Sequence, residues 1–85
     1  MSYEQLRTNL ICLRKRKGLT QHEVGELLGK SKRLPEKWEY GKNVPSTIDL
    51  EKLSHLYGTT IDDLVRHDLT QLNTYNKEWL SQQEA

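Results

Sequence analysis

The stretch LTQHEVGELLGKSKRLPEKWEYGKNVPS, residues 19–46, decides the fold of this chain. Thr20 is followed three residues later by Glu23, which is the spacing of a capping box at a helix N-terminus. Val24 and Leu28 are four residues apart, so they share one face of the helix that begins there. Gly29 provides a stop, because glycine tolerates the left-handed conformation that ends many helices. We therefore expect a helix over residues 21–28.

The residues after this stop predict a second short helix that packs on the first. Ser31 is a candidate cap for a helix that ends near Tyr40. Two helices that pack closely across a short turn need a small residue in the first and an apolar residue in the second, and Gly25 and Trp38 meet these needs. Lys30 and Pro35 stand where apolar residues are expected. The stretch predicts a helix-turn-helix unit.

The rest of the chain also favours helices. Leucine occurs 14 times, whereas valine and isoleucine together occur six times, and this bias favours helix over strand. Cap and stop residues predict further helices over about 3–17, 47–57 and 61–66. The candidate caps are Ser2, Ser46 and Thr60, and the stops are Gly18, Gly41 and Gly58. The predicted fold class is all-α, a five-helix bundle that contains the helix-turn-helix.

An additional amphipathic helix is expected at the C-terminus, where apolar residues recur at intervals of three and four. They are Val65, Leu69, Leu72, Tyr75 and Trp79. We divide the chain into a domain over residues 1–66 and a helical extension over residues 67–85. The extension either folds back onto the domain or forms a seam for a second copy or another protein. We favour the seam, because a small core has little spare surface to receive these side chains.

Composition excludes several classes of protein. The 85 residues suit one small domain, and the longest apolar run, Leu10 to Leu13, is far shorter than the roughly 20 residues that span a bilayer. With no signal-peptide pattern, we expect a cytoplasmic protein without a membrane segment. The lone Cys12 and the scattered His22, His55 and His67 show no metal-ligand or catalytic spacing. We expect no cofactor, no metal and no enzymatic activity.

The charges divide unevenly along the chain, although the formal net charge is only +1. Residues 1–45 carry ten Lys and Arg against five Glu, whereas residues 46–85 carry three against seven acidic residues. Such polarity suggests that the first half faces a polyanion, although scattered surface charges can also divide unevenly by chance.

Over about residues 6–66 the chain resembles the helix-turn-helix domain of phage repressors and Cro-like regulators, the xenobiotic-response-element (XRE) family. The matching residues are Leu19-Thr20-Gln21, Val24, Leu28-Gly29, Ser31, Trp38-Glu39, Gly41-Lys42, Pro45-Ser46, Leu50, Leu53, Gly58, Ile61, Asp62 and Leu64. In this family the second helix of the motif enters the major groove of DNA.

The resemblance implies a role for three sets of residues. Lys32, Arg33 and Lys37 are the base-reading candidates, since Arg and Lys can bind guanine edges. The phosphate-contact candidates are Gln21, Tyr40, Lys42 and Asn43. Arg14 and Glu39 match a pair that forms a structural salt bridge between the first and third helices.

Pro35 departs from the family pattern, which has a branched apolar residue at this position. If Ser31 caps the helix, Pro35 distorts its first turn. Alternatively the helix starts at Pro35, where a proline is favourable, and Leu34 turns inward to fill the space. Either outcome allows Lys32 and Arg33 to lie on a loop.

The sequence thus predicts a sequence-specific transcriptional regulator that binds double-stranded DNA as a homodimer. The alternative is a protein-interaction module on the same fold, with DNA reading weakened or lost because of Pro35 and a protein partner bound through the C-terminal helix. Dimerisation would let two recognition elements address a two-fold symmetric site.

Overall fold

The computed structural model describes residues 3–71, which form five α-helices and no strand. They are α1 (Glu4–Arg16), α2 (Gln21–Leu27), α3 (Leu34–Glu39), α4 (Thr47–Tyr57) and α5 (Ile61–Arg66). The predicted all-α, five-helix class is confirmed. Within these residues no helix has the length and apolar character needed to cross a membrane.

Three of the predicted helix caps form as expected. Thr20 and Glu23 make a complete capping box at the start of α2: the Thr20 hydroxyl accepts from the Glu23 N–H at 3.1 Å, and the Glu23 carboxylate accepts from the Thr20 N–H at 2.9 Å. Ser46 and Thr60 accept a backbone N–H in the same way at the starts of α4 and α5. Another candidate, Ser2, lies outside the described residues. Caps therefore fix where α2, α4 and α5 begin.

Leucines spaced three and four residues apart build the core. Leu6, Leu10 and Leu13 of α1 are buried, as their helical spacing predicts. Tyr3 continues this spacing three residues before Leu6, but it is the residue before α1 and is 46% exposed. The other buried apolar residues are Val24, Leu28, Trp38, Leu53, Tyr57, Leu64 and Leu69. The core thus draws on every helix and on one residue beyond α5.

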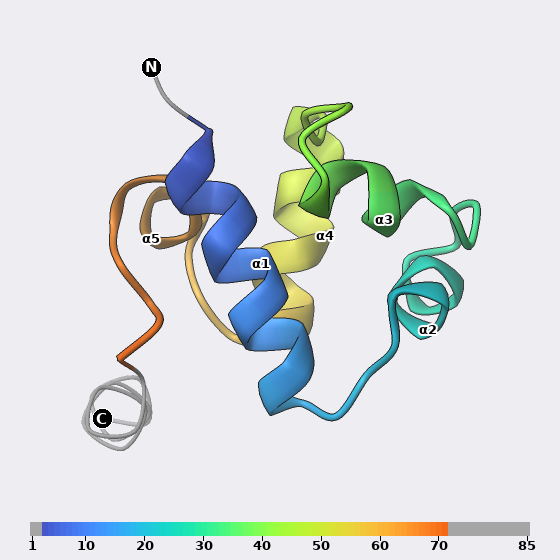
Figure 1. Cartoon of the computed structure of the whole chain (residues 1–85), viewed down its shortest axis with the longest axis horizontal. Coiled ribbons are helices and arrows are strands. Elements are labelled where there is room, and N and C mark those ends of the chain that lie inside the picture. The colour runs from blue at the N-terminus through green and yellow to red at the C-terminus, as the bar shows by residue number, and fades with distance from the viewer. Residues whose placement is uncertain (1–2, 72–85) are drawn as a thin grey trace.

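Figure 1 shows α2 and α3 on one side of α1, with α5 on the opposite side. Helix α1 packs against both α3 and α5, while α4 packs against α5, and α2 packs against α3. The short helix pair α2 and α3 therefore lies at one edge of the molecule, where α3 packs on the long helix α1.

Helix α3 begins at Leu34, not after Ser31 as one interpretation of the sequence had it. Ser31 instead stabilises the preceding turn, where its hydroxyl accepts from the Arg33 N–H at 3.2 Å and its carbonyl accepts from the Leu34 N–H at 3.1 Å. Pro35 occupies the first turn of α3, where a missing N–H costs nothing. Pro35 is buried and Leu34 packs partly buried against the core. The second interpretation, with Leu34 inward, is therefore correct, and the helix starts one residue before Pro35.

The folded unit extends past the predicted boundary at residue 66. Leu69 is 1% exposed and belongs to the core. Its N–H donates at 2.9 Å to Oδ1 of Asn9, whose Nδ2 donates to the carbonyls of Leu64 and His67 at 2.9 and 2.6 Å. Assigning Leu69 to an exposed seam was wrong, because this buried asparagine of α1 ties residues 67–69 to the domain. Val65 is half-buried, and Leu72, Tyr75 and Trp79 lie outside the described residues.

Candidate nucleic-acid interface

The close approach of α2 to the turn before α3 depends on Gly25. A Cβ built at Gly25 would lie 2.6 Å from the Ser31 carbonyl oxygen and 2.9 Å from the Lys32 Cα, distances that backbone atoms do not allow. Only glycine fits this contact, as the sequence analysis expected of a small residue here. The contact fixes how the residues 31–33 sit relative to α2.

Glu39, at the end of α3, joins three helices. Its Oε2 lies 2.8 Å from Nε of Arg14 on α1, and its Oε1 accepts from the second Arg14 nitrogen at 3.1 Å. The same Oε1 accepts from Nε2 of Gln21 on α2 at 3.0 Å. The Glu39 side chain is 5% exposed, and its hydrogen bond is the main reason that the pKa of Arg14 is raised. Because this fork-to-fork contact is directional, it sets the angle between α1 and α3.

The three base-reading candidates are all exposed, but they lie on different elements. Lys32 and Arg33 lie in the turn before α3, and Lys37 lies in its last turn. The Lys37 N–H donates to the Arg33 carbonyl, so these two residues are one turn apart and share a face. Lys32 leans toward α2, where its Nζ is 3.5 Å from a carboxylate oxygen of Glu26. Arg33 and Lys37 are therefore brought together, whereas Lys32 is set apart.

The connection that follows α3 is tied back to it through one carbonyl. The N–H groups of Lys42 and Asn43 both donate to the Lys37 carbonyl, at 2.9 and 3.3 Å. The side chains of Tyr40, Lys42 and Asn43 are exposed. The connection thus presents these phosphate-contact candidates beside the base-reading candidates of α3.

Gln21 differs from the other phosphate-contact candidates. Its partly buried side-chain amide donates one of its two N–H groups to Glu39, and its backbone N–H is among the first of α2, which have no partner within the helix. Glu36, which no sequence pattern singled out, lies on α3 between Arg33 and Lys37 in the chain. Its carboxylate is 3.8 Å from Nε2 of His22 on α2. Acidic side chains therefore lie among the basic ones on this surface.

Lys30, which breaks the apolar pattern of the motif, makes an ion pair instead. Its Nζ lies 3.4 Å from Oδ1 of Asp49, a buried oxygen that accepts no hydrogen bond from residues 3–71. Nζ of Lys52 donates to the Leu28 carbonyl at the end of α2 at 3.2 Å. These two lysines therefore join the end of α2 to α4.

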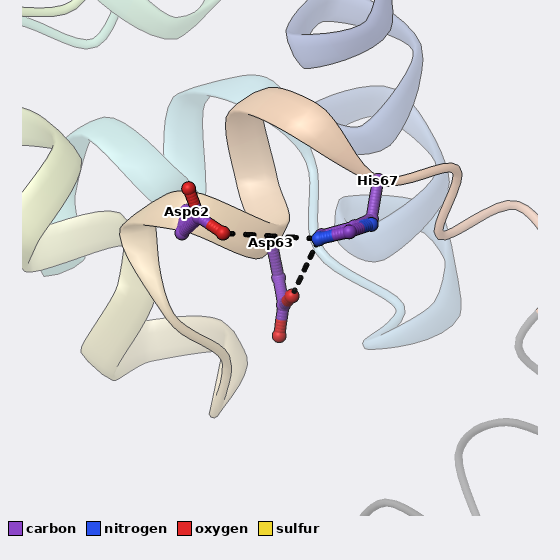
Figure 2. Close-up of side chains that lie close together, drawn as sticks. All are labelled: Asp62, Asp63 and His67. Carbon is purple, nitrogen blue, oxygen red and sulfur yellow. Dashed lines mark ion pairs between the residues drawn. The ribbon is translucent and has the colours of Figure 1, made fainter.

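One group of metal-ligating residues forms that the sequence analysis did not find. Asp62, Asp63 and His67 offer ligand atoms that lie within 4.8 Å of one another, and Figure 2 shows His67 facing both carboxylates. His67 Nε2 is 3.7 Å from each aspartate, and Nε of Arg66 is 3.0 Å from Asp62. Because Arg66 already contacts the Asp62 carboxylate, it competes with a metal cation for that ligand. The three residues therefore resemble an exposed ion-pair network more than a metal site. The prediction that the chain binds no metal stays a prediction.

Comparison with known proteins identifies the family. Residues 13–64, more than half of the chain, match the helix-turn-helix family. Over 67 residues the chain is 36% identical to the HTH-type transcriptional activator BcrR of Enterococcus faecalis, and this match covers 76% of the chain and 33% of that protein. The match therefore spans about a third of the length of this curated relative. No solved structure matches the chain significantly. The chain belongs to the helix-turn-helix family of DNA-binding domains, of the XRE type that its sequence resembles.

Proposed function

We propose that this chain is a sequence-specific transcriptional regulator of the phage-repressor and Cro-like type, which binds double-stranded DNA and catalyses no reaction. The observation that carries the proposal is the exposed, basic surface formed by Arg33, Lys37 and the connection after α3, held in place by the Glu39 contacts. The similarity to a transcriptional activator supports a role in regulation.

In the proposed complex, α3 and the turn before it enter the major groove. Arg33 is the main base reader, because its planar fork binds the two acceptors of guanine at once. Lys37, one turn later, reaches a guanine or the adjacent phosphate as a point charge. Lys32 has a lesser role, since its charge is shared with Glu26. With Pro35 in its first turn, α3 begins only at Leu34 and is short. Arg33 and Lys37 nevertheless stay on the surface.

Phosphate contacts set the register of this complex but carry no sequence information. We assign them to Lys42, Asn43 and Tyr40 and to the backbone N–H of Gln21. The Gln21 side chain acts indirectly, because it donates to Glu39 and so helps to fix α2 against α3.

We also propose that the chain binds DNA as a homodimer. The apolar spacing of Leu72, Tyr75 and Trp79 supports a seam within residues 67–85, although Leu69 is part of the core and not of the seam. A dimer doubles the phosphate contacts and matches a two-fold symmetric site. Sedimentation of the full chain tests this part alone, and a monomer at tens of micromolar contradicts it.

Selection from a pool of random-sequence duplexes tests the main proposal. We expect one sequence to be enriched, and we expect Arg33→Ala and Lys37→Ala each to weaken its binding by about 1–3 kcal/mol and to relax the choice of base. Lys15→Ala is the matched control, since Lys15 is an exposed lysine at the end of α1. Unchanged base choice in the Arg33 and Lys37 variants would remove both residues from base reading, and enrichment of no sequence would contradict a sequence-specific regulator.

A further inference from the structure

A cavity of about 310 Å³ lies between the start of α1 and the connection from α3 to α4. Its floor is apolar and buried, with Leu6, Trp38 and Pro45 contributing. Tyr3 and Val44 also line it, and these side chains are 46% and 48% exposed. An apolar hollow that exposes two large side chains has room for a ligand that is partly apolar.

Arg7 brings a positive charge to this cavity. Its Nε donates to the Glu39 carbonyl at the end of α3, at 3.2 Å. The guanidinium also lies against Gly41, where a Cβ would come within 3.0 Å of Nε. These two contacts fix the position of the guanidinium.

Within residues 3–71 no ion pair joins Arg7 to a carboxylate. Arg14 and Arg66 differ in this respect, because each contacts a carboxylate. A fixed guanidinium with free N–H donors is a binding group for a phosphate or a carboxylate.

The cavity is continuous with the surface proposed to face DNA. Asn43, one of the phosphate-contact candidates, lines the same hollow as Arg7 and Gly41. Lys42, the residue between Gly41 and Asn43, is exposed. Arg7, from a different helix, therefore joins the set of residues that can contact the nucleic-acid backbone.

We propose that this cavity binds one sugar–phosphate unit of the DNA backbone, an inference that rests on the proposed function. Arg7 binds the phosphate, with Asn43 beside it, and Tyr3 and Val44 pack on the deoxyribose. Glu4 also lines the cavity and repels a phosphate near it, so the phosphate belongs beside Gly41, where the guanidinium lies. The contact is independent of sequence, because the backbone is the same at every base pair.

Salt dependence of binding to a random-sequence duplex tests this inference. Between about 50 and 200 mM KCl, each phosphate contact contributes about −0.9 to the slope of log affinity against log salt. We expect Arg7→Gln to make the slope less negative by about 0.9 per bound chain, whereas Arg7→Lys, which keeps the charge, retains most of it. Arg66→Gln is the matched control: it removes the same charge from α5, and we expect the slope of the unaltered chain.

Three outcomes separate the possibilities. If the unaltered chain does not bind the duplex, the proposed function fails. If it binds but Arg7→Gln and Arg66→Gln have the same slope, only the role of Arg7 is overturned. If circular dichroism shows that Arg7→Gln does not fold, the NMR signal of the Arg7 Nε–H group in the unaltered chain replaces the variant as the test. We expect this signal to shift when the duplex is added. We expect it to stay in place when inorganic phosphate is added at equal ionic strength. A shift with inorganic phosphate alone indicates a free-anion site and overturns the proposal.

Discussion

Replacing Asn9 by alanine tests how the segment after α5 is held. Asn9 is fully buried, and its side chain satisfies two carbonyl groups and one N–H group of residues 64–69. The Asn9→Ala change leaves these three backbone groups without their partner.

The expected loss follows from these contacts. A hydrogen bond of this kind contributes about 1 kcal/mol net, and a buried group left unsatisfied costs about 1–3 kcal/mol. Three such groups give a loss of at least about 3 kcal/mol. If residues 67–69 detach as a result, exposing Leu69 adds about 1.5–3 kcal/mol. A domain of this size has a total stability of about 5–15 kcal/mol, so the change should bring it close to unfolding at room temperature.

Urea unfolding of the full chain, followed by circular dichroism, measures this loss. Thr8→Ala is the control, because Thr8 is the exposed neighbour of Asn9 and its hydroxyl only donates to the Glu4 carbonyl of its own helix. We expect the control to stay within about 0.5 kcal/mol of the unaltered chain. A loss below about 1 kcal/mol for Asn9→Ala would refute the claim that this asparagine joins residues 67–69 to the domain.

Further predictions concern the helix pair and the core. Gly25→Ala should destabilise the chain by about 1–3 kcal/mol in urea unfolding and weaken DNA binding, because its Cβ collides with backbone atoms of Ser31 and Lys32; no loss would show that the turn adapts. Pro35→Ile should lower the melting temperature, since Pro35 is buried at a suitable helix start, and a rise would mean that the native turn is strained. Burial raises the pKa of the Tyr57 hydroxyl, with Glu39 adding to the effect. The neutral hydroxyl is therefore favoured in the folded state, and its stabilising contribution is complete below about pH 10 and lost as the pH rises further. Tyr57→Phe should show a smaller fall in urea midpoint between about pH 8 and 11 than the unaltered chain, and an equal fall would assign the alkaline loss to other groups.

Much of the fold could be predicted because its signals are local. The caps Thr20, Ser46 and Thr60 each lie three residues from the N–H that they accept, so the starts of three helices were correctly predicted. Leu6, Leu10 and Leu13 reveal the buried face of α1 through spacing alone. Such features need no knowledge of what lies across the core.

The features that were missed depend on contacts between distant residues. Asn9 reads as an ordinary polar residue of a helix, and only the fold brings it to residues 64–69. Leu69 fits an amphipathic pattern equally well as seam or as core, because spacing does not say which surface covers it. The position of the Arg7 guanidinium has the same origin, since the carbonyl that fixes it is 32 residues away in the chain.

At the interface, sequence identified the residue types but not their partners. Gln21 was predicted to contact a phosphate, which stays a prediction, but the hydrogen bond from its amide to Glu39 was not expected. Lys32 was grouped with Arg33 and Lys37, although it leans toward Glu26 on α2. The sequence left two possible starts for α3, because a proline can either distort the first turn of a helix or stand at its beginning. The partly buried Leu34 and the helix start at this residue decide for the second.

The affinity of the unaltered full chain for a random-sequence duplex, measured as a function of salt, tests the central claim most directly. An interface built from Arg33, Lys37, Lys42 and the backbone N–H groups beside them should neutralise several phosphates. The account predicts binding at low salt and a steep negative slope of log affinity against log salt, of about −0.9 for each phosphate contacted. Absence of binding at low salt, or binding that does not change with salt, would contradict it.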